Sequence, residues 1–139
     1  MPSKPATKSA IKSVKPARAG RSPLSAPVAR FRMRVTNGAE IMIGPGKIAL
    51  LEAIEETGSI TAAAKHLGMS YRRAWLLMDS INHSLKQPAV DTAVGGERGG
   101  GTRLTETGRQ VIDLYRRIEG NAARATASEL KVLMGLLAH

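Results

Sequence analysis

Cysteine is absent from the 139 residues of this chain. Its absence excludes disulfide bonds, thiolate nucleophiles and cysteine-ligated zinc, and it is compatible with a reducing cytosol. No apolar run approaches the ~20 residues that span a bilayer, and no apolar segment follows the N-terminal charges as a signal peptide requires. We therefore expect a cytoplasmic protein without a membrane partner.

Acidic residues are missing from residues 1–30, although this segment is rich in Lys and Arg. The whole chain has 21 Lys and Arg against 11 Asp and Glu, and its net charge of +10 favours a polyanionic partner such as nucleic acid. The Pro, Ala and Ser of residues 1–30 bury too little apolar surface to offset the entropy of ordering, which predicts a disordered tail. Three roles stay open for it: sequence-independent phosphate contact, a solvated segment, or a transit peptide.

Residues 31–139 are predicted to form one domain that is mainly α-helical with small β hairpins. Apolar and polar residues alternate over 31–36, and Asn37-Gly38 then marks a turn to a partner strand over 40–43. Three helices follow in close succession and leave little room for a parallel sheet. Their predicted ranges are 46–57, 60–67 and 71–86.

The C-terminal part is predicted as a long helix over about 105–138, capped by Thr105 and broken between 120 and 128. This helix has more apolar surface than one small domain can cover. A two-fold dimer interface is the natural use of such a surface, so we expect a homodimer.

Residues 59–78, SITAAAKHLGMSYRRAWLLM, have the layout of a helix-turn-helix. Ser59 and Ser70 are suited to cap the two helix N-termini, and Gly68 supplies the positive φ that ends the first helix. The apolar residues at helical spacing, including Trp75, are expected in the core. The alternative for Trp75 is packing against backbone sugars.

The second helix of this motif begins with side chains that can meet phosphates and base edges in a major groove. Its N-terminus also presents free amides and a positive dipole, which suit a phosphate. The alternative for the two arginines is a solvated basic face. The predicted contacts of the motif with double-stranded DNA are Ser59, Thr61, Ser70, Tyr71, Arg72 and Arg73.

A second β hairpin is predicted directly after the motif, with strands over 89–94 and 102–104 and the tip GGERGGG. Glycines let a backbone approach a minor groove, and arginines supply the charge that a narrow groove attracts. The alternative is a floppy hairpin without a role in binding. The predicted contacts of this wing are Gly95, Gly96, Arg98, Gly99, Gly100 and Arg103.

Residues 44–49, GPGKIA, match the G-x-G-x-x-A pattern of dinucleotide-binding loops. That function needs a βαβ unit and an acidic residue about 20 positions further on, and the sequence has neither. We therefore assign the segment to the start of a helix and expect no cofactor. The three histidines have no ligand spacing, and no nucleophile is paired with a base, so we expect neither a metal site nor an enzyme.

Three segments, LLEAIEETGSITAAAKHLGMSYRRAW, GGERGGG and LTETGRQVIDLYRRIE, together resemble the N-terminal DNA-binding domain of ModE-type molybdate-responsive transcription regulators. The broader LysR-type winged helix is similar. The resemblance covers about 31–120, and it implies a homodimer in which 70–73 begin the recognition helix and 95–103 form the wing. Molybdate sensing in this family uses separate C-terminal β-rich domains, whereas this sequence ends at His139, so molybdate binding is not carried over.

The leading hypothesis is a dimeric, sequence-specific transcription regulator that acts on the bacterial nucleoid. One alternative is a nucleoid-type protein that binds DNA with little regard to sequence through its basic tail. The other is a subunit that pairs with a full-length regulator and holds it in inactive heterodimers.

Overall fold

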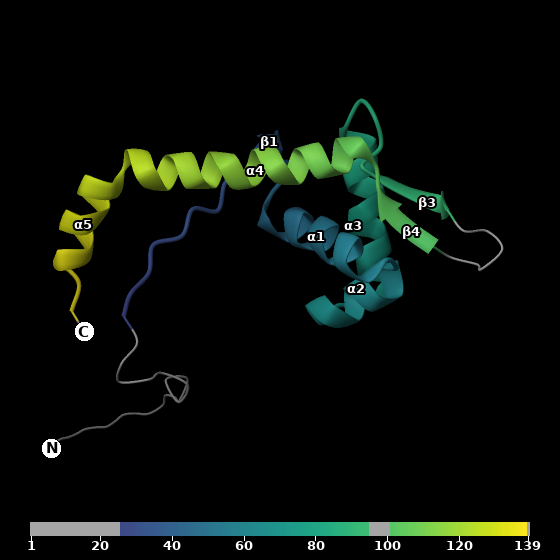
Figure 1. The fold of residues 1–139 in the computed structure, drawn as a ribbon, viewed down its shortest axis with the longest axis horizontal. Helices are drawn as coiled ribbons and strands as arrows, with labels where there is room; N and C mark the ends of the chain where they lie inside the picture. The colour runs from purple at the N-terminus through teal and green to yellow at the C-terminus, as the bar shows by residue number, and fades with distance from the viewer. Residues whose placement is uncertain (1–25, 95–100, 139) are drawn as a thin grey trace, which may run out of the picture. The chain divides into compact units, whose positions relative to one another are not determined.

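The computed structural model describes residues 26–94 and 101–138 (Figure 1). Arg30–Leu130 form one compact unit, whereas residues 26–29 and 131–138 fall outside it. Within this unit, helices and two small antiparallel hairpins alternate in the order β1β2α1α2α3β3β4α4. The predicted fold class, mainly α with small hairpins in a winged helix-turn-helix, is confirmed.

Three helices form the centre of the compact unit: α1 (Pro45–Thr57), α2 (Ile60–Leu67) and α3 (Tyr71–Ser84). Their bounds lie within two residues of the predicted ones, because the signals that end a helix are local. Gly58 and Gly68 adopt the left-handed conformation, with φ of 77° and 69°, and their N–H groups bond the last turns of α1 and α2.

Each of these helices buries one face in a shared core (Figure 1). The buried positions of α3 are Ala74, Met78 and Ile81, which recur every three to four residues and therefore share one stripe. Small residues at Ala63 and Ala64 of α2 are also buried, which lets α2 approach its neighbours closely. The remaining core comes from α1, the base of the second hairpin and α4.

The first hairpin pairs β1 (Val35–Asn37) with β2 (Glu40–Ile43). The strand predicted over 31–36 is therefore wrong for residues 31–34, where the Met33 carbonyl instead accepts a hydrogen bond from the Tyr115 hydroxyl at 2.8 Å. Val35, expected on a buried face, is 45% exposed. The pairing of β1 with β2 shifts register after Val35, so the alternation of apolar and polar residues over 31–34 does not continue into the first hairpin.

Lys47, from the GPGKIA segment, is buried in the first turn of α1. Its Nζ donates to the carbonyls of Ile41 and Met42 and, at 3.0 Å, to Oγ of Ser80. The lysine thus joins β2 to both α1 and α3. This segment is the start of a helix, as predicted.

The second hairpin pairs β3 (Val90–Val94) with β4 (Gly101–Leu104), and α4 (Glu106–Ala125) follows it. Thr105 caps α4, as predicted, by accepting a hydrogen bond from Gly108 N at 3.1 Å. α4 begins against the base of β3: a Cβ at Gly108 would lie only 2.3 Å from the carbonyl oxygen of Ala89.

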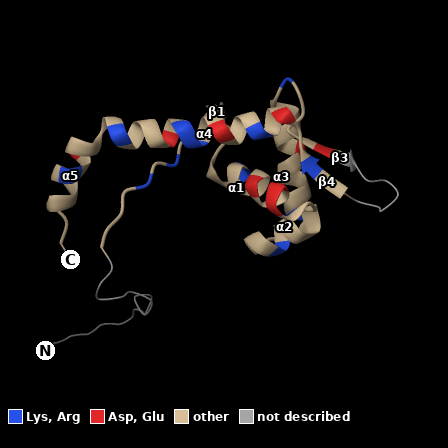
Figure 2. Cartoon of the chain, viewed as in Figure 1, with Lys and Arg blue, Asp and Glu red and all other residues tan. Residues whose placement is uncertain are grey.

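Ion pairs fix α4 to α1. Arg116 makes two hydrogen bonds to Glu52, at 2.6 and 2.9 Å, and Arg109 contacts Glu55 at 3.3 Å. Hydrogen bonds to Glu52 and then Glu119 raise the pKa of Arg116 above its ordinary value. Figure 2 shows the result, with acidic residues on α1 beside basic ones on α4.

The break predicted between 120 and 128 occurs at Thr126, which separates α4 from α5 (Ala127–Gly135). Gly120 stays helical, whereas the Thr126 hydroxyl bonds back to the Ala122 carbonyl at 2.7 Å. No helix in the described part of the chain is long and apolar enough to cross a membrane.

Candidate nucleic-acid interface

Serine side chains cap the N-termini of α2 and α3. Oγ of Ser59 accepts from Ala62 N at 2.9 Å, and Oγ of Ser70 accepts from Arg73 N at 3.0 Å. Both serines were predicted as caps, and this is confirmed. Each hydroxyl proton stays available to donate to a phosphate oxygen, so capping and the predicted DNA contact are compatible.

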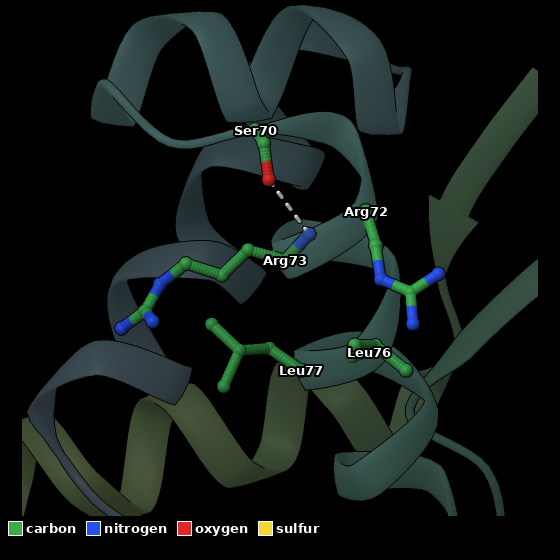
Figure 3. Close-up of a pocket in the computed structure, with 5 residues that line it drawn as sticks. All are labelled: Ser70, Arg72, Arg73, Leu76 and Leu77. Atoms are coloured by element: carbon green, nitrogen blue, oxygen red, sulfur yellow. Dashed lines mark hydrogen bonds between the residues drawn. The ribbon is translucent and has the colours of Figure 1, made fainter.

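The first turn of α3 presents its predicted contact residues to the outside (Figure 3). Tyr71 is 54% exposed, and Arg72 and Arg73 are also exposed. Figure 3 shows the two arginine side chains leaving the helix in different directions. They border the cap-side hollow, a shallow depression of about 360 Å³. Its lining residues are Ser70, Arg72, Arg73, Leu76 and Leu77.

A second depression, the wing-side hollow of about 230 Å³, lies between the start of α2, α3 and the base of the wing. It brings together three predicted contacts, Ser59, Thr61 and Tyr71. Its other lining residues are Trp75, for which the sequence analysis gave contact with backbone sugars as the alternative, and Ile60, Thr92 and Thr102, which it did not name as contacts. Hydroxyl groups from two helices and two strands therefore surround one aromatic-lined depression, a combination that suits a sugar–phosphate backbone.

Trp75 lies where the alternative of the sequence analysis put it, and its expected place in the core is wrong. Its side chain is 40% exposed and borders the wing-side hollow. The buried stripe of α3 contains Ala74 and Met78. Trp75 follows Ala74 directly, and because each helical residue is rotated by about 100° from the one before, its side chain points away from that stripe.

The base of the wing is fastened to α3 by Asn82. Its Oδ1 accepts from Ala89 N at 2.8 Å and Val90 N at 3.1 Å, and its Nδ2 donates to Val90 O at 3.1 Å. On the other strand, Thr102 N donates to the carbonyl of Gly58 at 3.1 Å. The hairpin is thus positioned directly by the helix-turn-helix.

Arg103 is exposed on β4, and its Cα partner in the ladder is Asp91 on β3. Figure 2 shows this pair as the blue and red segments of the wing. Arg103 lies in neither hollow. The predicted wing contacts Gly95, Gly96, Arg98, Gly99 and Gly100 lie outside the described residues.

Charge on the motif helices favours an anionic partner. α2 and α3 contain Lys65, Arg72 and Arg73 against one acid, Asp79, which lies 3.5 Å from His83. The acids Glu52 and Glu55 of α1 are engaged by arginines of α4. Arginines and hydroxyls beside helix N-termini are common phosphate and base contacts.

A capped two-helix motif with an attached β hairpin defines the winged helix-turn-helix, a class of domain whose second motif helix enters the major groove. Residues 46–109 match the family model of the bacterial regulatory helix-turn-helix protein, lysR family. They form a helix-turn-helix domain of the LysR type. The resemblance predicted from the sequence is confirmed.

Two characterised relatives are similar over this region. The chain is 41% identical over 88 residues to the molybdenum transport protein ModE of Azotobacter vinelandii, covering 63% of this chain and 33% of the relative. It is 43% identical over 91 residues to the molybdenum-pterin-binding protein MopB of Rhodobacter capsulatus, covering 66% and 34%. The chain thus spans about a third of the length of these relatives.

The crystal structure of a CbnR_DBD–DNA complex is similar in fold, with a TM-score of 0.50 at 23% identity. The match covers 63% of this chain and 95% of that chain. At this level of identity the likeness supports the fold alone, and it agrees with the winged helix seen here.

Proposed function

We propose that this protein is a sequence-specific DNA-binding transcription regulator that acts on the bacterial nucleoid in the cytoplasm. The single observation that carries the proposal is the exposed N-terminal turn of α3. There Ser70, Tyr71, Arg72 and Arg73 stand clear of the core on a capped helix that its neighbours hold in place.

In the proposed complex, α3 lies in the major groove and its first turn meets base edges. The wing-side hollow receives the sugar–phosphate backbone. The relative named transcriptional regulator ModE in Yersinia pestis, 44% identical over 71 residues, supports this role. The match reaches a third or less of such relatives, so the proposal is confined to DNA binding.

We further propose that the protein binds as a homodimer. α4 exposes Leu114 and Ile118, and the first hairpin exposes Val35 and Ile41. Apolar surface of this kind suits a second copy, and a two-fold dimer would place two α3 helices in successive half-sites of a palindrome.

Selection of bound fragments from a random DNA pool, at two salt concentrations, tests the proposal. Enrichment of one palindromic sequence that persists at the higher salt is the expected result. Equal retention of all sequences would instead support the nucleoid-type alternative. Repeating the selection with molybdate shows whether that anion changes binding.

A further inference from the structure

The outer face of α3 is more apolar than phosphate contact requires. Tyr71, Trp75 and Leu76 are 54%, 40% and 50% exposed, and together with Arg72 they line a shallow depression of about 390 Å³. Trp75 and Leu76 lie on the second turn of the helix, one turn beyond Arg72.

Charge complementarity identifies the occupant of this face as DNA. The guanidinium group of Arg72 lines the depression that contains Trp75 and Leu76, and Ser70 and Arg73 adjoin Leu76 in the neighbouring cap-side hollow. A protein partner with an apolar surface would leave these cations without an anion, whereas duplex DNA supplies phosphates at the edges and bases between them.

The major groove offers one apolar group, the C5-methyl of thymine. We propose that Trp75 and Leu76 read thymine methyl groups, so that A·T pairs lie at the centre of each half-site. This inference rests on the proposed function, because it requires α3 to lie in the major groove. Trp75 and Leu76 are then specificity-determining residues beside the arginines.

Helix geometry places the two kinds of contact on neighbouring base pairs. A rise of ~1.5 Å per residue puts Leu76 about 6 Å beyond Arg72, which is roughly one to two base-pair steps for a helix in the major groove. The structure thus assigns the thymines to positions one or two pairs from the base that Arg72 contacts.

Replacement of thymine by deoxyuridine in the selected operator tests the inference, because it removes the methyl group and leaves the base pairing intact. Wild-type protein is expected to lose about fourfold in affinity for each contacted methyl group. Uracil at positions outside the half-sites is the matched DNA control, and no loss is expected there.

Protein variants assign the methyl contact to a side chain. We expect Trp75→Ala and Leu76→Ala to bind the thymine operator more weakly and to lose sensitivity to uracil at one position each. Leu76→Met, which keeps an apolar contact, should retain that sensitivity. Because both side chains are exposed, the variants should fold, and unchanged far-UV circular dichroism and urea unfolding verify this.

The outcomes separate the inference from the function on which it rests. An operator bound specifically by wild-type protein, but with equal affinity after uracil replacement, would overturn the methyl contact alone. Uracil sensitivity that survives in both alanine variants would do the same. If no sequence is enriched in the selection, the proposed function fails and the methyl contact fails with it.

Discussion

Arg72 and Arg73 are neighbours in sequence but point in different directions from α3 (Figure 3). Arg72 lies on the outer face with Leu76 and borders two depressions, whereas Arg73 borders only the cap-side hollow. We therefore expect Arg72 to contact a base edge and Arg73 to contact phosphate.

Alanine substitutions distinguish these two roles. Arg72→Ala should cost about 1–3 kcal/mol of binding free energy and relax specificity at one operator position. Arg73→Ala should weaken binding to all sequences alike and reduce the slope of log affinity against log salt by about 1. Affinities measured on an operator series at several salt concentrations decide between them, and identical behaviour of the two variants would contradict the assignment.

Gly108 is required by close packing rather than by a positive φ. Because a Cβ there would lie 2.3 Å from the backbone oxygen of Ala89, Gly108→Ala should force α4 away from β3. We expect a loss of about 1–3 kcal/mol in the free energy of unfolding, measured with urea. Gly46→Ala is the control: no atom lies within 4 Å of its Cβ, and we expect a gain of about 0.4–1 kcal/mol. Equal stability of the two variants would show that the contact relaxes freely.

Tyr115 links stability to alkaline pH. Burial raises the pKa of its phenol above the ordinary value of 10.0, and the charge of Glu119 raises it further, although nearby arginines oppose this. The folded state therefore favours the protonated phenol, which also donates to Met33 O. This contribution to stability is complete below about pH 10 and is lost as the pH rises through the folded-state pKa.

Tyr115→Phe removes both the hydrogen bond and the titration. We expect it to lower the free energy of unfolding by about 1 kcal/mol near neutral pH. Above about pH 10 the wild type should lose stability more steeply than the variant. Urea unfolding across this range measures the difference between the two proteins, and parallel curves would rule out the assigned role.

At the scale of elements, Asn82 sets the position of the wing. Asn82→Ala leaves the amides of Ala89 and Val90, two fully or almost fully buried residues, without their acceptor. We expect a loss of about 2–4 kcal/mol in unfolding free energy and faster hydrogen exchange at both amides. His83→Ala is the matched control on the next residue of α3. Its ring is exposed and bonds only within α3, so a change below about 0.5 kcal/mol is expected. Unchanged exchange in the Asn82 variant would mean that the wing is held by its other contacts.

The elements that the sequence predicts well are those fixed by neighbouring residues. α2 has the predicted bounds because Ser59 and Gly68 act locally as its two caps. Trp75 was misplaced because a single apolar residue fits either of two adjacent helix faces, and only the packing of α1 and α2 decides which face is buried. Asn82 was missed because it bonds backbone amides across the loop to β3, and Thr102 because its partner Gly58 lies far along the chain; no sequence pattern marks either contact.

For the whole molecule, the exposed apolar side chains of α4 predict self-association. Leu114 and Ile118 are 43% and 45% exposed, on a helix that packs into the core through the buried Tyr115. Leu114→Asp should place a charge in the proposed dimer interface without affecting the core. We expect this variant to be monomeric at concentrations where the wild type is dimeric, as measured by sedimentation equilibrium.

Ala123→Asp is the control for the added charge. Ala123 is exposed and lies nine residues beyond Leu114, about half a turn around the helix. It should leave the dimer intact. A monomeric Leu114→Asp variant should still bind an isolated half-site like the wild type. It should lose affinity for the full palindrome, because two monomers bind the two half-sites independently. If Leu114→Asp stays dimeric, α4 is not the interface, and the two half-sites must be bridged by another surface.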